Sequence, residues 1–132
     1  MARMGSFNVR GLERLRDRIA RVDYDRFMRQ TAMQLAQRLI ALTKEKTPTI
    51  TGNLKRNWSM GTVEKAGNEY IITVSNNVEY ASFVEYGHRN RNHTGWVPGR
   101  YMLTISENEL KEAAPGIIER RMEAFLREVF RD

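Results

Sequence analysis

The chain has 132 residues, enough for one compact domain, and 41% of them are hydrophobic and 29% charged. This composition is that of an ordinary soluble domain and excludes disorder throughout. Because there is no cysteine, disulfides, thiol nucleophiles and thiolate metal sites are excluded as well. The longest apolar runs are too short to cross a bilayer, and the first ten residues lack the apolar core of a signal peptide. We therefore expect one domain over residues 1–132, flexible over 1–7 and made in the cytoplasm.

The net charge of +6 is unevenly distributed along the chain. Residues 1–46 carry 11 Lys/Arg against 5 Asp/Glu, residues 47–100 carry 6 against 4, and residues 101–132 carry 5 against 7. The basic first segment and the mildly acidic last one could attract each other, within a subunit or between neighbours. Basic surface also binds phosphates irrespective of base sequence, but no nucleic-acid-binding motif accompanies the charge.

Residues 8–46 are predicted to be helical. Apolar residues recur at helical spacing in two stripes. The stripes do not join smoothly near residues 22–25, where an aspartate could cap a new helix. The other face of the first part is basic: it carries Arg10, Arg14, Arg18 and Arg21. This face is either solvated or directed at a partner.

The middle of the chain is predicted to form a β-hairpin. Proline and glycine in residues 47–53 end the helix. Residues 54–64 and 69–75 have the alternation of strands, and residues 65–68 between them have the length of a hairpin connection. Because two strands alone are marginally stable, the hairpin must pack against the long helix or gain further strands. Trp58 is expected in the core.

The next two segments are less regular. Residues 78–86 are apolar with a mixed period, which predicts a short helical turn or a bent strand that closes the core. Residues 87–100 contain four basic or histidine side chains ahead of Trp96 and no acid. They are predicted to form a loop, and loops of this length are often functional or mobile. Trp96 could fold back onto the core or anchor an interface, a role in which tryptophan is enriched.

The chain ends in a predicted helix. Ser106 and Glu109 form an S-x-x-E capping box, and apolar residues repeat at helical spacing up to the end. Pro115 should kink or break this helix, because it lacks an N–H and its ring clashes with the preceding turn; two helices joined near residues 113–114 would also fit. The predicted fold class is thus α+β, with a long N-terminal helix that is continuous or broken near residues 22–25, a central antiparallel β-hairpin or small sheet, and a C-terminal helix kinked near Pro115.

Few residues suggest chemistry. His88 and His93 could serve as general bases or metal ligands, but the residues between them are arginines and asparagines, whose charge repels a cation. Glu79 and Glu85 could act as an acid–base pair, although salt bridges to nearby arginines are the better interpretation. No glycine fingerprint for phosphate is present. We therefore predict no enzymatic activity, no catalytic residues, no metal and no cofactor.

Three segments resemble a family of small tail-component proteins of tailed phages. Residues 47–58 are similar to its TP-x-x-TG-x-L-x-x-S/W segment, residues 76–88 to its N-x-x-x-YA-x-x-VE-Y/F-G signature, and residues 97–103 to its P-x-x-F-L/M entry to the last helix. At the last of these, Tyr101 and Met102 replace the usual phenylalanine and leucine. The resemblance covers roughly residues 9–130 and is strongest to versions from Gram-positive phages, prophages and phage-tail-like bacteriocins.

This resemblance implies a structural virion protein akin to the lambdoid minor tail protein Z. Such a neck protein completes the tail and joins it to the head by assembling as a ring, often of six copies. The implied partners are copies of itself and the tail-tube, terminator and head-connector proteins, with no membrane. The implied location is the neck or tail of the virion, after assembly in the host cytoplasm.

Two alternatives stay open. One is a tail-terminator ring that caps the tail tube, and the other, from a different class, is a basic nucleic-acid-binding module. Basic side chains could also line a lumen and contact passing DNA without sequence preference. The candidate interface residues are Arg14 and Arg18 in the first helix and Arg89, Arg91, His93 and Trp96 in the 87–100 loop.

Overall fold

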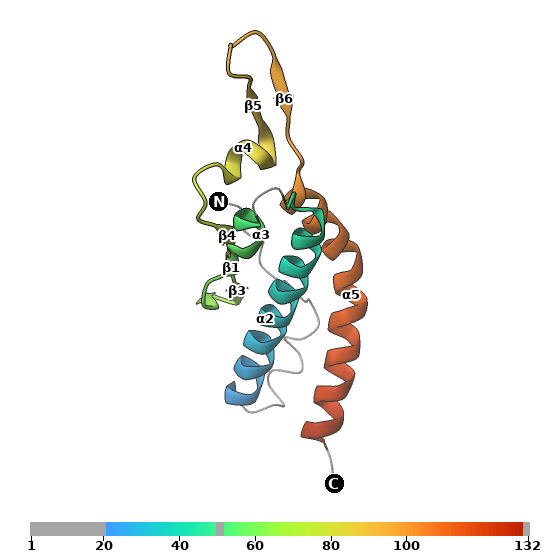
Figure 1. Ribbon diagram of the computed structural model, residues 1–132. Helices are drawn as coiled ribbons and strands as arrows, with labels where there is room; N and C mark the ends of the chain where they lie inside the picture. Colours follow the sequence, from blue (N-terminus) through green and yellow to red (C-terminus); the bar gives the residue numbers. More distant parts are fainter. Residues whose placement is uncertain (1–20, 50–51, 131–132) are drawn as a thin grey trace.

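The computed structural model describes residues 21–49 and 52–130 (Figure 1). The elements in chain order are α2 Arg21–Lys46, α3 Asn53–Arg56, β1 Trp58–Met60, β2 Glu64–Ala66, β3 Glu69–Ile71, β4 Val74–Asn76, α4 Ala81–Tyr86, β5 Gly87–Arg89, β6 Trp96–Pro98 and α5 Met102–Val129. Helices α2 and α5 lie side by side and antiparallel, and strands β1–β4 lie along another side of α2 (Figure 1). The predicted α+β class is confirmed.

The core lies between α2, α5 and the first strands. Helix α2 contributes Ala32, Leu35, Ala36 and Leu39, all at most 1% exposed. Their spacing of three and four residues places them on one helix face. From the other elements come Leu54, Trp58, Ile72, Val74, Met102, Leu103, Leu110 and Ala114. Burying a side chain of leucine size contributes about 2 kcal/mol, so this cluster is a main source of stability.

Both long helices are continuous in the described residues. Helix α2 passes through residues 22–25 without a break, and its predicted part before residue 21 lies outside the described residues. Helix α5 passes through Pro115, so the alternative of two helices joined near residues 113–114 is wrong. Pro115 is exposed, and the helix continues despite the backbone hydrogen bond that proline cannot donate.

The predicted hairpin is confirmed, with a one-residue irregularity. Trp58 lies opposite Asn76 and Met60 opposite Val74, whereas Glu64 lies opposite Ile71. The register therefore shifts by one residue, and the extra residue on the first strand is a β-bulge. The turn at residues 67–68 closes the ribbon, with Gly67 at φ +63°. Residues 54–56, predicted as strand, instead belong to the single turn α3, in which the Arg56 N–H donates to the Gly52 carbonyl (3.1 Å).

A polar contact fixes the far end of the hairpin to α2. The Tyr70 hydroxyl donates to Asp25 Oδ1 (2.8 Å), and Arg29 Nε donates to Asp25 Oδ2 (2.8 Å). Arg29 also reaches the hairpin backbone, donating from Nη1 to the Val63 carbonyl (3.0 Å). The hydrogen bonds from Tyr70 and Arg29 lower the pKa of Asp25 below its ordinary value of 3.8, because they stabilise the ionised carboxylate.

The lowered pKa of Asp25 makes this contact sensitive to acid. A depressed carboxylate pKa stabilises the fold above the ordinary value, and this contribution is lost as the pH falls through the lowered pKa. We expect Asp25→Asn to lower the free energy of unfolding by roughly 1 kcal/mol at pH 7, and the difference from wild type to shrink below about pH 4. Urea unfolding across this pH range measures it. Asp23→Asn is the matched control, because among the described residues Asp23 has only an exposed ion pair with Arg26; an equal effect there would contradict this interpretation.

Candidate functional site

The most distinctive feature is a two-stranded ribbon that projects beyond the end of the helix pair (Figure 1). Strands β5 and β6 pair antiparallel, with Gly87 opposite Pro98 and Arg89 opposite Trp96. Asn90 closes the connecting turn: its N–H donates to the Gly95 carbonyl and its Oδ1 accepts from the Thr94 N–H (2.9 Å each). We call residues 87–98 the arm. The prediction of a loop over residues 87–100 is wrong here, because three-residue strands carry too short a pattern to be detected.

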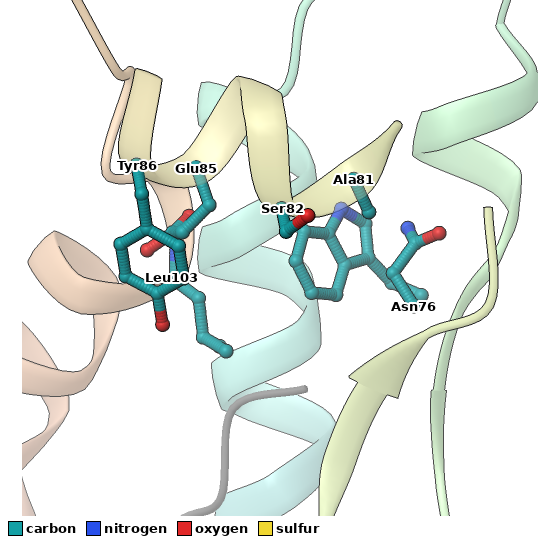
Figure 2. A pocket seen from close by; sticks show the side chains of 7 residues that line it. Asn76, Ala81, Ser82, Glu85, Tyr86 and Leu103 are labelled. Carbon is teal, nitrogen blue, oxygen red and sulfur yellow. The ribbon is translucent and has the colours of Figure 1, made fainter. Parts of the chain in front are cut away.

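The base of the arm is fixed by the carboxylate of Glu85, which is 5% exposed. Oε1 accepts from the Leu103 N–H (3.0 Å), and Oε2 accepts from both the N–H (3.0 Å) and the hydroxyl (2.7 Å) of Thr104. The first N–H groups of a helix have no partner within it, so Glu85 caps α5 from another element. Its negative charge is also favoured at the positive end of the helix. Figure 2 shows Glu85 beside Leu103.

The predicted capping box at Ser106 is therefore wrong. Helix α5 begins at Met102, one turn earlier, and the Ser106 hydroxyl donates to the Met102 carbonyl inside the helix (2.7 Å). Glu85 also affects the charges nearby. Burial raises the pKa of Glu107, Lys111 opposes this shift, and the negative charge of Glu85 adds to it.

Two glycines allow the chain to pass closely where the arm leaves and returns. The N–H groups of Arg100 and Tyr101 donate to the carbonyls of Val84 (2.8 Å) and Glu85 (3.0 Å). Gly87 has φ +90°, and a Cβ there would lie 2.6 Å from the Val97 carbonyl oxygen. A Cβ on Gly99 would overlap the backbone of residues 85–87. Only glycine fits at these two positions.

Other motif residues also hold the fold. The Trp58 indole N–H donates to the Thr47 hydroxyl (2.9 Å), which donates to the Thr43 carbonyl (2.7 Å). Asn76 joins two segments, because its Nδ2 donates to the Leu54 carbonyl (2.7 Å) and its Oδ1 accepts from the Val78 N–H (3.0 Å). The cavity between these residues and α4 (Figure 2) has a volume of about 30 Å³. It is too small for a substrate.

Apolar side chains gather on the surface around the arm. Of the nine large apolar side chains that are exposed in the described part of the chain, seven lie on or beside α4, the arm and the start of α5: Tyr80, Phe83, Tyr86, Trp96, Val97, Tyr101 and Ile105. Trp96 is 62% exposed, so the alternative in which it folds back onto the core is wrong. An open groove of about 360 Å³ runs along this end, lined by Pro48, Leu54, Tyr80, Phe83, Val84, His88, Val97, Pro98 and Arg100.

The predicted interface residues divide into two groups. Arg89, Arg91, His93 and Trp96 come together in the arm, and all four are exposed. Arg14 and Arg18 lie outside the described residues. The aromatic residues of α4 were not predicted as surface, because a six-residue helix gives no periodicity from which to tell its buried face from its exposed one.

The residues considered for chemistry do not form a catalytic or metal site. Glu79 is exposed, whereas Glu85 is buried and bound to α5. The expected salt bridge from Glu85 to an arginine is absent from residues 21–49 and 52–130. His88 lines the groove, with its Nδ1 buried and without a partner among the described residues, and His93 is exposed on the arm. Within the described residues, no group of three His, Cys, Asp or Glu could hold a metal ion.

None of the helices in the described ranges combines the length and apolar character needed to cross a membrane.

A family model with the description "Bacteriophage HK97-gp10, putative tail-component" matches residues 9–87. The chain belongs to this HK97-gp10-like family. No curated protein and no solved structure matched the chain. The family match ends at Gly87, where the arm begins.

Membership of the HK97-gp10-like family identifies a structural component of a phage tail. Its place is accordingly the virion, and its role involves contact with other virion proteins. The motifs on which the resemblance was based now have physical roles, because Thr47, Trp58, Asn76 and Glu85 each make a hydrogen bond between segments.

We expect Glu85→Ala to destabilise this tail component by about 2–4 kcal/mol, because it leaves buried helix N–H groups without a partner. Glu85→Gln should be intermediate, since an amide keeps only one acceptor oxygen. Urea denaturation followed by circular dichroism measures both. The matched control is Glu79→Ala, an exposed glutamate six residues away, which should stay within about 0.5 kcal/mol of wild type. Equal stability of the Glu85 and Glu79 variants would contradict the cap.

Proposed function

We propose that this tail component is a neck protein that completes the tail and joins it to the head, by assembling with copies of itself as a ring. The observation that carries the proposal is the cluster of exposed apolar side chains at the arm end. Soluble monomers rarely expose contiguous apolar patches of this kind, and such patches mark interaction sites. The residues around the arm are therefore suited to contact other protein chains.

The shape of the molecule favours a repeating assembly. The arm projects from one end of a rigid helix pair (Figure 1), so it can reach a neighbour without rearrangement of the core. A contact between two different surfaces of identical subunits repeats head to tail, and closes into a ring when the rotation permits. Such a ring would contact the tail tube on one side and the head connector on the other.

The alternatives fit the same observations less well. A tail terminator would use a similar ring at the end of the tube, and would differ in its effect on tail length. A nucleic-acid-binding module would combine exposed aromatic rings with a basic groove; here Trp96 lies opposite Arg89, but no nucleic-acid-binding motif accompanies them. Contact with DNA in the lumen of a ring stays compatible with the proposal, because such contacts need only positive charge.

Deletion of the reading frame from the phage or prophage that encodes it distinguishes these roles. If the chain joins heads to tails, electron microscopy of the deletion should show filled heads and tails of normal length that are not joined. Supplying the wild-type chain in trans should restore joined particles. Tails of uncontrolled length would instead indicate a terminator. Normal particle numbers and infectivity without the chain would contradict the proposal.

A further inference from the structure

The arm exposes side chains for contact on both of its faces. Consecutive residues of a strand point to opposite faces, so Trp96 and Val97, 62% and 40% exposed, lie on different sides of the ribbon. Arg89 is paired directly with Trp96 and shares its face. A two-stranded ribbon has no core of its own and is marginally stable in water. The Trp96 face therefore gains stability when a second surface covers it.

The charge of the arm indicates what kind of surface this is. Residues 87–100 contain three arginines and no acid, a charge of +3. Residues 102–119 contain four glutamates and one lysine, a charge of −3. In the described part of the chain, neither Arg89 nor Arg91 forms an ion pair, and neither do Glu112 and Glu119. Glu109 is paired with Lys46, whereas these two arginines and two glutamates are available to a partner.

Three glutamates of α5 lie along one exposed stripe of the helix. Residues spaced by three or four positions lie on one face of a helix. We call the following exposed set the acidic stripe: Ile105, Asn108, Glu112, Pro115, Glu119 and Glu123. It lies opposite the side on which Leu103, Leu110 and Ala114 pack into the core. Ile105 is 43% exposed, so the stripe combines apolar and acidic groups, as the Trp96 face combines an aromatic ring with a basic group.

We propose that the Trp96 face of the arm on one copy docks against the acidic stripe of the next copy. Trp96 packs on the apolar residues of the stripe, and Arg89 and Arg91 pair with Glu112 and Glu119. Aromatic residues surrounded by charge pairs are typical of stable interfaces. This inference rests on the proposed function, and it names the contact that would build the ring. Because donor and acceptor are different surfaces, each copy binds one neighbour on either side.

Charge reversal tests the pairing. The arm variant carries Arg89→Glu and Arg91→Glu, and the stripe variant carries Glu112→Arg and Glu119→Arg. Each variant alone places like charges at every contact and should remain at the mass of the 15.4 kDa chain, whereas wild type assembles. An equimolar mixture should recover the wild-type mass, because arm and stripe then have opposite charges at both kinds of contact. Light scattering behind a sizing column measures the masses, and circular dichroism checks that each variant folds.

Two further variants separate the effect of charge pairing from the effects of net charge and of the apolar contact made by Trp96. Arg38→Glu with Arg127→Glu changes the net charge by the same amount as the arm variant, at exposed positions outside the arm and stripe, and should assemble as wild type does. Trp96→Ala leaves every charge in place and should raise the dissociation constant by tenfold or more, on the order expected for an interface anchor.

Assembly of either reversal variant by itself, or a mixture that stays monomeric, would overturn the inference. So would a wild-type chain that stays monomeric at every concentration and salt while the deletion leaves heads and tails unjoined; the joining role would then stand, without a ring built by this contact. Conversely, a recovered mixture together with normal particles in the deletion would support the contact and contradict the proposed function.

Discussion

The contact between the Glu85 carboxylate and the first turn of α5 determines the arrangement of the whole arm end. Burying a carboxylate is unfavourable unless its oxygens are hydrogen-bonded. Here three donors, all from residues 103–104, satisfy them, and bonds to an ionised acceptor are stronger than neutral ones. Since Glu85 lies just before the arm and the residues it binds lie just after it, this contact closes the base of the arm.

The same contact explains why the polypeptide passes so closely through residues 85–101. Gly87 and Gly99 leave no side chain between the two passing segments, and Tyr101 takes a left-handed conformation, at φ +49°, to turn the chain into α5. Such a conformation is unfavourable for a residue other than glycine. It persists because the carbonyl of Glu85 accepts the Tyr101 N–H while the carboxylate of Glu85 accepts the N–H groups of Leu103 and Thr104. The motif residues therefore serve architecture, and the surfaces they position serve assembly.

The sequence predicted those parts of the fold that depend on local pattern. The apolar spacing of α2, the hairpin with its turn at Gly67 and the burial of Trp58 were all correct, because each follows from residues close together in the chain. The start of α5 was not predicted: the local pattern at Ser106 and Glu109 competed with a cap from Glu85, some 20 residues earlier, which no local rule can detect. The arm was missed because its strands are three residues long.

The exposed surface of the arm was predicted in part. The basic charge of residues 87–100 and their tryptophan led to the prediction that Arg89, Arg91, His93 and Trp96 lie on the surface. All four are exposed on the arm. The apolar residues of α4 and Ile105 were assigned to the core or not considered, because apolar composition alone does not distinguish a buried residue from one that awaits a partner. In the proposed assembly, the surface that covers these residues belongs to another subunit. A contact between subunits produces no periodic pattern in the sequence, so it could not be predicted.

Amide hydrogen exchange at Leu103 and Thr104 tests the central claim most directly. The N–H groups at the start of a helix have no partner inside it, so protection at these two positions requires the Glu85 carboxylate. The account predicts slow exchange at both amides in the wild-type protein, together with loss of this protection and of protection in the arm in Glu85→Ala, while the β1–β4 strands stay protected. Rapid exchange at Leu103 and Thr104 in the folded wild-type protein would contradict it.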